Sequence, residues 1–143
     1  MIILDSNVIS ALMREAPDAV VLAWLDRQPS HSVWTTAITV LENRFGLARL
    51  PQGRRRARLE AEFERIISED LENRVLAFDY AAAERAAELI ARQADAGRPR
   101  ELRDSMIAGI TLARRASLAT RNVRHFDDAG IDLVDPWAQR AKA

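Results

Sequence analysis

Short apolar runs alternate along the chain with longer stretches in which apolar residues recur at helical spacing. Met1 to Leu4 is apolar throughout, which is typical of a strand that a parallel sheet buries on both faces. Apolar residues three and four positions apart, bounded by Pro, Asp or Gly, predict helices between these runs. This order of elements predicts an α/β protein with a central parallel sheet of about five strands. The expected strands lie near residues 1–4, 32–35, 74–78, 117–120 and 131–134, and the expected helices near residues 8–13, 17–28, 36–49, 54–72, 79–96 and 102–115.

The length and composition favour one soluble domain. A chain of 143 residues with 48% hydrophobic residues can bury a sizeable core, and no linker or repeat divides it. We therefore expect a single domain that spans residues 1–143. No run approaches the roughly 20 apolar residues of a membrane span, and no basic segment precedes the first apolar run. These features predict a cytoplasmic protein without a membrane anchor or signal peptide.

Several classes of active site are excluded by residue types that the chain lacks. Without cysteine it has no disulfide, thiolate zinc site or catalytic thiol. Only His31 and His125 are histidines, which argues against a multi-histidine zinc site and a Ser-His-Asp hydrolase. A response-regulator receiver needs a lysine at its catalytic face, and the only lysine is Lys142, near the end of the chain. A haloacid-dehalogenase phosphotransferase needs a second aspartate where this chain has Asn7.

Arginine supplies nearly all of the positive charge. Lysine and arginine together number 21, as do aspartate and glutamate, so the net charge gives no indication of a nucleic-acid partner. Arginine binds phosphate through paired hydrogen bonds, but GC-rich codon usage also explains its abundance. Arg54, Arg55, Arg56 and Arg58 gather at the start of a predicted helix, where positive charge opposes the helix dipole. This cluster is either a solvated face or a surface for phosphate or a partner.

Three acidic residues fall at positions where an isolated charge is costly. Asp5 directly follows the first strand, and sites in open α/β sheets form beyond the carboxyl ends of strands. Glu42 shares the apolar face of its helix with Ile38 and Phe45. Asp104 lies near the start of a later helix, in line with apolar residues one turn on. We therefore predict that these carboxylates converge on Mg²⁺ or Mn²⁺, because hard oxygen ligands suit such ions.

Each of these acids also has an ordinary structural explanation. Asp5 could cap the following helix, although we expect Ser6 to be its N-cap. Glu42 could pair with an arginine of its own or a neighbouring helix, and Asp104 is a normal acid for a first helical turn. Only the combination of three acids on separate elements favours the metal site, because unpaired buried charges are expensive.

Four segments contain motifs that resemble, in the same order, those of PIN domains, the nuclease fold of VapC-type bacterial toxins. They are Met1–Ile9, Thr39–Gly46, Arg103–Ala108 and Ala119–Phe126. The later Asp135-Pro136-Trp137 is similar to the ending of the FitB-like branch. The resemblance covers nearly the whole chain and implies a PIN-like α/β/α sandwich.

The resemblance also implies a set of site residues. Asp5, Glu42 and Asp104 match the acids that hold Mg²⁺ or Mn²⁺, and Asn122 matches the fourth acidic position. Because Asn122 is an amide, it can orient water or phosphate but adds no negative charge. The family's supporting polar positions match Ser6, Asn7 and Thr120, and the acids that could substitute for the fourth one are Asp127 and Asp128.

The implied activity is cleavage of RNA by a metal-activated water. Arg121, Arg124 and the cluster containing Arg54 and Arg55 could hold the RNA backbone. The resemblance further implies a homodimer neutralised by a small cognate antitoxin, in an assembly that could be larger than a dimer. The charged helix after residue 51 is a candidate surface for either partner. One alternative stays open, a non-catalytic module that binds nucleic acid or the antitoxin, because Asn122 replaces the fourth acid.

Overall fold

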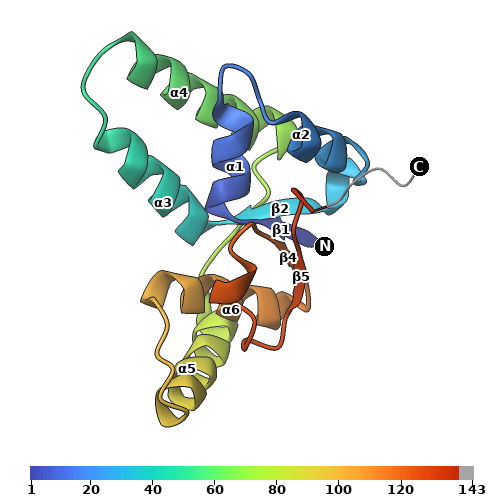
Figure 1. The fold of residues 1–143 in the computed structure, drawn as a ribbon, viewed down its shortest axis with the longest axis vertical. Coiled ribbons are helices and arrows are strands. Elements are labelled where there is room, and N and C mark those ends of the chain that lie inside the picture. The colour runs from blue at the N-terminus through green and yellow to red at the C-terminus, as the bar shows by residue number, and fades with distance from the viewer. Residues whose placement is uncertain (139–143) are drawn as a thin grey trace.

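A computed structural model describes residues 1–138, and Lys142 lies outside this range. Its centre is a five-stranded sheet in the order β3-β2-β1-β4-β5, with every neighbouring pair parallel (Figure 1). This confirms the predicted fold class and the number of strands. The strands are β1 (Ile2–Leu4), β2 (Val33–Thr36), β3 (Val75–Leu76), β4 (Ser117–Ala119) and β5 (Asp132–Val134).

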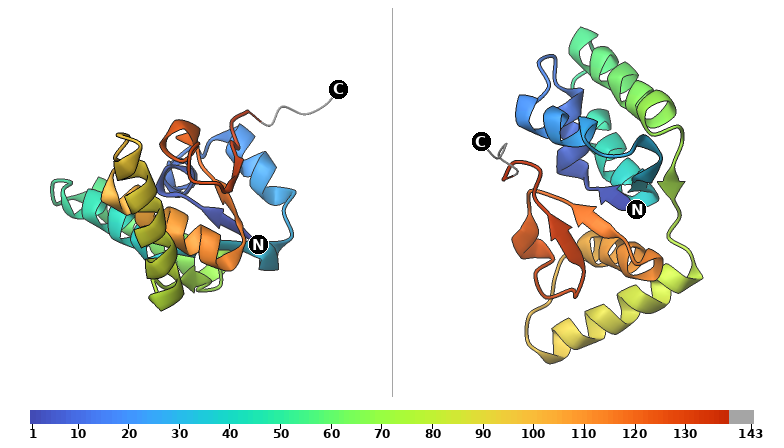
Figure 2. Two further views of the ribbon diagram at one scale, coloured as in Figure 1. Left: turned by 90° about the horizontal axis from the view of Figure 1, so that it is seen from below. Right: turned by 90° about the vertical axis from the view of Figure 1, so that its right-hand side faces the viewer.

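Six α-helices cover the two faces of the sheet. α1 to α4 lie on one face, and α5 and α6 on the other, so that the fold is an α/β/α sandwich (Figures 1 and 2). A π-helical turn, η2 (Ile66–Asp70), continues α4, and two 3-10 turns are η1 (Ser30–Ser32) and η3 (Val123–His125). The α-helices are α1 (Ser6–Met13), α2 (Ala19–Asp26), α3 (Ala37–Ala48), α4 (Arg54–Arg65), α5 (Tyr80–Asp95) and α6 (Leu102–Arg114).

The strands are buried on both faces because consecutive side chains enter different cores. In β1, Leu4 packs with α1 to α4, whereas Ile3 packs with α5 and α6. The same alternation holds in β4, where Ala119 joins the first core and Leu118 the second. A strand with both faces covered needs no polar residues, which explains the uninterrupted apolar run at the start of the chain.

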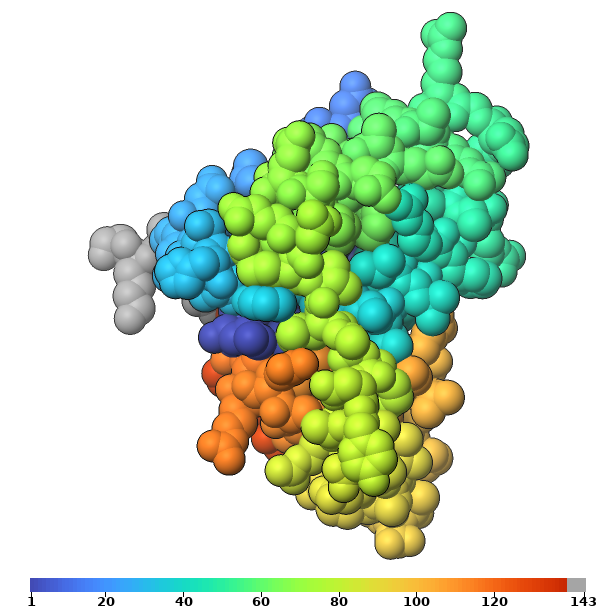
Figure 3. Space-filling model, turned by 180° about the vertical axis from the view of Figure 1, so that it is seen from behind, coloured from blue at the N-terminus to red at the C-terminus, as the bar shows by residue number. Residues whose placement is uncertain are grey.

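The strand order reverses between β1 and β4. The chain moves outward from β1 to β2 and β3, then returns through α5 and α6 to place β4 on the other side of β1. The carboxyl ends of β1 and β4 therefore border the crevice at which open parallel sheets bind ligands. Seen from behind, α4 and α5 form opposite ends of the elongated molecule (Figure 3).

Helix α6 packs closely on α5 because of one glycine. A Cβ atom at Gly109 would lie 2.5 Å from the carbonyl oxygen of Ala82 and 2.8 Å from the Cβ of Ala86. Such distances are shorter than van der Waals contact, so a larger residue would push the two helices apart. Since α6 carries Asp104, this contact also fixes the position of one predicted site residue.

Two details of the predicted helices are wrong. The N-cap of α1 is Asp5, not Ser6, because the Asp5 carboxylate accepts a hydrogen bond from the backbone N–H of Ser6. Phe45 does not share a buried face with Ile38, since Phe45 is 52% exposed and Ile38 is buried. In the described part of the chain, no helix combines the length and apolar character needed to span a membrane.

Candidate active site

Asp5 lies at the carboxyl end of β1, at the reversal of strand order, and is almost fully buried. Its Oδ1 accepts a hydrogen bond from the Ser6 N–H at 2.8 Å. Its Oδ2 accepts bonds from the Thr120 hydroxyl at 2.8 Å and the Asn7 amide at 3.3 Å. Burial raises the pKa of Asp5, while these hydrogen bonds and the nearby His125 oppose the rise.

Glu42 reaches the same region from α3, and its side chain is 20% exposed. Burial, followed by the charge of Asp5, raises the pKa of Glu42 to about 7. A guanidinium nitrogen of Arg103 lies 4.0 Å from its Oε2. Its Oε1 is buried and has no hydrogen-bond partner within residues 1–138. Glu42 is thus a carboxylate with an open acceptor and only weak compensation of its charge.

Asp104 lies in the first turn of α6, and its side chain is 19% exposed. Burial is the main cause of its raised pKa, and the charge of Asp5 adds to it. The Nδ1 atom of His125 lies 3.2 Å from its Oδ2 and opposes this rise. His125 belongs to η3, in the loop after β4, so two distant segments meet at this carboxylate.

The three acids form an electrostatically coupled group. Asp5 raises the pKa values of both Glu42 and Asp104. In residues 1–138, however, no three His, Cys, Asp or Glu side chains are grouped closely enough to hold a metal ion as they stand. The donors still fit a hard divalent cation, because all are carboxylate oxygens and one of them, Glu42 Oε1, has no hydrogen-bond partner among the described residues. A bound cation would have to draw the carboxylates closer together.

The predicted supporting residues surround Asp5. The buried Thr120 hydroxyl donates to Asp5 and accepts from the Asn7 amide and the Asn122 N–H. The side-chain oxygen of Asn7, Oδ1, in turn accepts a hydrogen bond from the backbone N–H of Arg121 at 3.0 Å. The structure therefore joins the end of β1 to the end of β4 through side chains that the sequence places 113 or more residues apart.

Asn122 and the two possible substitute acids lie in the loop after β4. Asn122 is exposed, and its backbone rather than its side chain makes the bond to Thr120. Asp127 and Asp128 both pair with Arg100, at 3.0 Å and 3.2 Å. Both carboxylates are thus ion-paired with Arg100 in this structure.

The four arginines predicted to bind RNA occupy different environments. Arg55 lines a cleft of about 510 Å³ beside Glu42, together with Arg14 and Arg103. Arg54 and Arg124 are exposed. The Arg121 guanidinium lies 4.8 Å from the centre of the Trp137 ring, in a cation–π contact. Only Arg55 therefore shares a cleft with one of the three acids.

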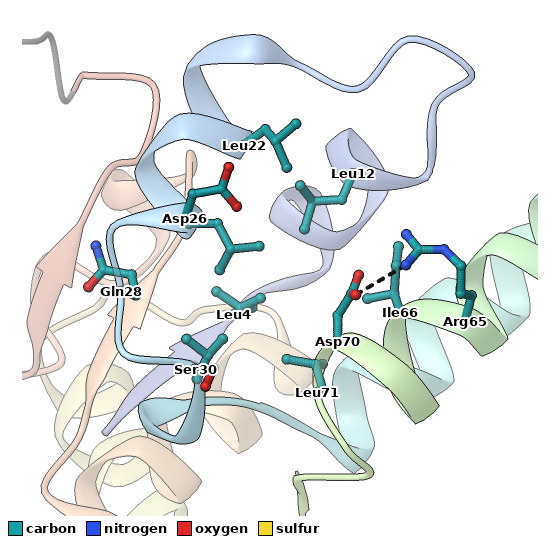
Figure 4. Close-up of a pocket in the computed structure, with 12 residues that line it drawn as sticks. Leu4, Leu12, Leu22, Asp26, Gln28, Ser30, Arg65, Ile66, Asp70 and Leu71 are labelled. Carbon is teal, nitrogen blue, oxygen red and sulfur yellow. Dashed lines mark hydrogen bonds and ion pairs between the residues drawn. The ribbon is translucent and has the colours of Figure 1, made fainter.

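A second cavity, of about 420 Å³, lies between α2, η2 and the start of β2 (Figure 4). Leu12 and Leu22 border it, and the ion pair between Arg65 and Asp70 lies at its edge. None of the predicted site residues lines this cavity. It is therefore distinct from the cleft beside Glu42.

A profile of the PIN domain matches residues 2–131, which include all three acids and the loop after β4. The chain belongs to the PIN domain family. This match confirms the family that the four sequence motifs resemble.

Curated relatives match nearly the full length of this PIN domain protein. A VapC ribonuclease, Y4jK of Sinorhizobium fredii, is 41% identical over 137 residues, covering 96% of this chain and 98% of the relative. The toxin FitB of Neisseria gonorrhoeae is 34% identical and covers 96% of this chain and 99% of its own length.

Solved structures of toxin–antitoxin complexes have the same fold. The structure of FitAB bound to a DNA fragment matches with a TM-score of 0.87 and 32% identity, covering all of both chains. The DNA-bound VapBC of Salmonella typhimurium matches with a TM-score of 0.82 and 26% identity over 94% of this chain and 97% of that one. These likenesses confirm the PIN-like α/β/α sandwich.

Sequence reasoning gave no role to three residues that the structure brings to or near the acids. His125 contacts Asp104, Arg103 approaches Glu42, and Arg100 holds the loop that carries His125. The only available signal was the position of His125, one of two histidines, within the last PIN-like motif. Arg100 and Arg103 could not be distinguished by sequence from the other arginines.

Proposed function

We propose that residues 1–143 form a single nuclease domain, which cleaves RNA with the help of Mg²⁺ or Mn²⁺ and is the toxin of a toxin–antitoxin pair. The observation that carries this proposal is the coupled group of Asp5, Glu42 and Asp104 at the strand-order reversal. Three carboxylates with raised pKa values are costly to fold together, and a divalent cation would remove that cost. The VapC ribonuclease and FitB relatives support the same activity.

Each acid has a distinct role in this proposal. Asp5 and Asp104 would hold the cation, because hydrogen bonds from Thr120 and the contact with His125 orient their carboxylates. Glu42 would either join them or accept a proton from the attacking water at Oε1, the oxygen without a hydrogen-bond partner in the described part of the chain. When bound, the cation would lower the pKa of water and neutralise charge on the phosphate.

Polar and basic residues would position the RNA around these acids. The exposed amide of Asn122 could orient water or a phosphate oxygen beside the bonded pair of Thr120 and Asp5. Arg55 and Arg103 line the cleft next to Glu42 and would bind the RNA backbone there. Arg121 and Arg124 would contact more distant phosphates from the loop after β4.

We also propose a homodimer and a small cognate antitoxin as partners. Similar solved structures include FitAB and VapBC complexes bound to DNA. Leu41 and Phe45, both more than half exposed on α3, offer an apolar surface next to Glu42. An antitoxin arginine placed among the acids would satisfy carboxylates that lack a full set of partners. A monomer in light scattering, without a small protein from the same operon at purification, would contradict this assembly.

A gel assay on RNA pools tests the nuclease. The protein, freed of any antitoxin, would be incubated with total tRNA and ribosomal RNA in Mg²⁺, in Mn²⁺ and in EDTA, beside the Asp5→Asn variant. We expect discrete fragments with either metal and none with EDTA or with the variant, whose melting temperature shows that it is folded. No cleavage by folded wild type in either pool would contradict the nuclease and favour a module that binds without cutting. Asn122→Asp would then test whether the missing fourth acid is the reason.

A further inference from the structure

Arg100, in the segment between α5 and α6, makes three hydrogen bonds and one further ion-pair contact to one loop. Its Nε atom donates to Asp128 Oδ2 at 3.3 Å, and its Nη2 atom lies 3.2 Å from the same oxygen as part of the ion pair. Nη2 also donates to Asp127 Oδ1 at 3.0 Å, and Nη1 donates to the Arg124 carbonyl at 3.1 Å. The Arg100 side chain is only 20% exposed, so its N–H groups are satisfied mainly by these protein atoms and less by solvent.

Gln93 strengthens this cluster from the last turns of α5. Its Nε2 donates to Asp128 Oδ1 at 3.0 Å, so both oxygens of that carboxylate are bonded. Burial alone would raise the pKa of Asp128, but the bonds from Gln93 and Arg100 outweigh it and lower the pKa. Gln93 Oε1 is buried and has no hydrogen-bond partner in the described range. The opposite orientation of the amide would place this oxygen, instead of the Nε2 donor, against the Asp128 carboxylate. The hydrogen bond from Gln93 to Asp128 is thus made at the cost of leaving the Gln93 amide oxygen buried and unsatisfied.

The loop held by this cluster also carries His125. Arg100 binds the carbonyl of Arg124, the residue directly before His125. On the other side, the Nδ1 atom of His125 lies 3.2 Å from Asp104 Oδ2. Gln93, Arg100, Asp104 and His125 border one gap, which is too narrow for a water molecule. A shift of Arg100 would therefore reach His125 through the backbone of Arg124, whose carbonyl Arg100 binds.

We propose that Arg100, with Asp128 and Gln93, is a positioning residue for the nuclease site, which it serves by holding His125 against Asp104. The proposal rests on the proposed function, because the positioning matters for catalysis only if Asp104 takes part in cleavage. Phe126 is fully buried and anchors the loop after His125, and Thr120 anchors it before Asn122. The His125 side chain itself is 54% exposed, so burial does not restrain it. The bond from Arg100 to the carbonyl of the preceding residue supplies that restraint.

The Arg100→Gln variant tests this role, and Arg98→Gln is its matched control. Arg98 is exposed, lies in the same segment and loses the same charge on substitution. We expect Arg100→Gln to lower kcat by about tenfold to a hundredfold with little change in KM, since misplaced site groups slow the reaction without weakening substrate binding. Arg100→Lys should recover only part of kcat, because an ammonium group cannot make the same set of bonds. Arg98→Gln should cleave like wild type.

Two further readouts separate positioning from a general loss of stability. The NMR signals of the His125 ring should shift in Arg100→Gln and stay unchanged in Arg98→Gln. In a His125→Ala background, Arg100→Gln should cause little further loss of kcat, because the two substitutions interrupt the same contact. Unchanged ring signals in Arg100→Gln, or an undiminished effect in the His125→Ala background, would overturn the proposal. If the wild type cleaves no RNA, the proposed function fails, whereas the ring signals still show whether Arg100 positions His125.

Discussion

At the scale of single residues, the three acids differ in how their charges are compensated. Asp5 accepts hydrogen bonds on both oxygens, and Asp104 has the His125 imidazole beside it. Glu42 has a single arginine nitrogen at 4.0 Å and a buried oxygen without a partner in the described structure. Glu42 is therefore the acid whose charge has the fewest compensating partners in the described structure.

The Glu42→Gln variant should be more stable than wild type in metal-free buffer above pH 7. The pKa of Glu42 is raised from 4.5 to about 7, so the folded state binds a proton more tightly than the unfolded state. The free energy of unfolding of wild type should consequently fall as the pH rises from about 4.5 to 7, and Gln removes this contribution. The variant should gain about 1–3 kcal/mol at pH 8 and nothing below pH 4.5.

Urea unfolding in EDTA across this pH range measures the difference. Wild type and Glu42→Gln contain the same charged groups around position 42, which are Asp5, Arg103, Asp104 and Glu101. A constant difference between the two proteins from pH 4 to pH 8 would show that the Glu42 pKa is not raised by folding.

Thr120 should be needed for both stability and activity, because its hydroxyl connects three partners. Thr120→Val keeps the shape of the side chain but removes the donor to Asp5 and the acceptor for Asn7 and the Asn122 N–H. We expect a loss of about 1–3 kcal/mol in the free energy of unfolding, together with reduced cleavage. Thr120→Ser retains the hydroxyl and is the control. Equal denaturation midpoints for the Val and Ser variants would argue against this network.

At the scale of elements, the site depends on where helices begin and how closely they pack. Thr36 caps α3 and Glu101 caps α6, so the caps fix the start of the helices that carry Glu42 and Asp104. The contact of α6 with α5 across Gly109 then sets the distance of Asp104 from the sheet.

Gly109→Ala should destabilise the protein, whereas Gly46→Ala should not. The added methyl group at position 109 would overlap α5, and overpacking of this kind costs about 1–3 kcal/mol. At Gly46 in α3 no atom lies within 4 Å of the new methyl group, so the better helix former should add up to about 1 kcal/mol. Melting temperatures of the two variants provide the measurement. An unchanged melting temperature for Gly109→Ala would mean that α5 and α6 can separate freely.

Elements with a strong local signal could be predicted from the sequence. The uninterrupted apolar run of β1 and the aspartates that bound α2 and α5 gave helix and strand positions close to those observed. The structure shows that these aspartates, Asp18 and Asp79, are the N-caps of the two helices. The face of α3 was less predictable, because the helix buries Ile38 but leaves Leu41 and Phe45 exposed. Periodicity alone gives the faces of a helix, and the neighbouring elements decide which of them is covered.

At the scale of the whole molecule, the fold brings together residues from both ends of the chain. The reversal of strand order puts Asp5 of β1 beside Thr120 of β4, while α3 and α6 add Glu42 and Asp104 from opposite layers. The proximity of the three acids could be predicted, because Asp5 follows a strand and because Glu42 and Asp104 lie one turn from buried apolar residues of their helices. The Arg100 cluster and the contact of His125 with Asp104 could not, since both depend on tertiary packing between α5, α6 and a loop.

Removal of divalent metal should lower the stability of the folded protein. A ligand that binds only the folded state adds about 2.7 kcal/mol when its concentration is about 100 times its Kd. We therefore expect Mn²⁺ to raise the melting temperature of wild type and EDTA to reverse the rise. Asp5→Asn should show a much smaller rise, since it removes one proposed ligand. Equal shifts in wild type and Asp5→Asn would place the ion elsewhere on the protein.

The rate at which a defined RNA is cleaved in Mn²⁺ tests the central claim most directly. The RNA would be one that the pool assay identifies. The proteins compared would be wild type, Asp104→Asn and, as a control, Asp95→Asn at the exposed last residue of α5. We predict that Asp104→Asn lowers the rate by at least about 100-fold, that EDTA abolishes cleavage by wild type and that Asp95→Asn has no effect. Cleavage by Asp104→Asn at the wild-type rate, or cleavage that persists in EDTA, would contradict a metal-dependent nuclease site at these acids.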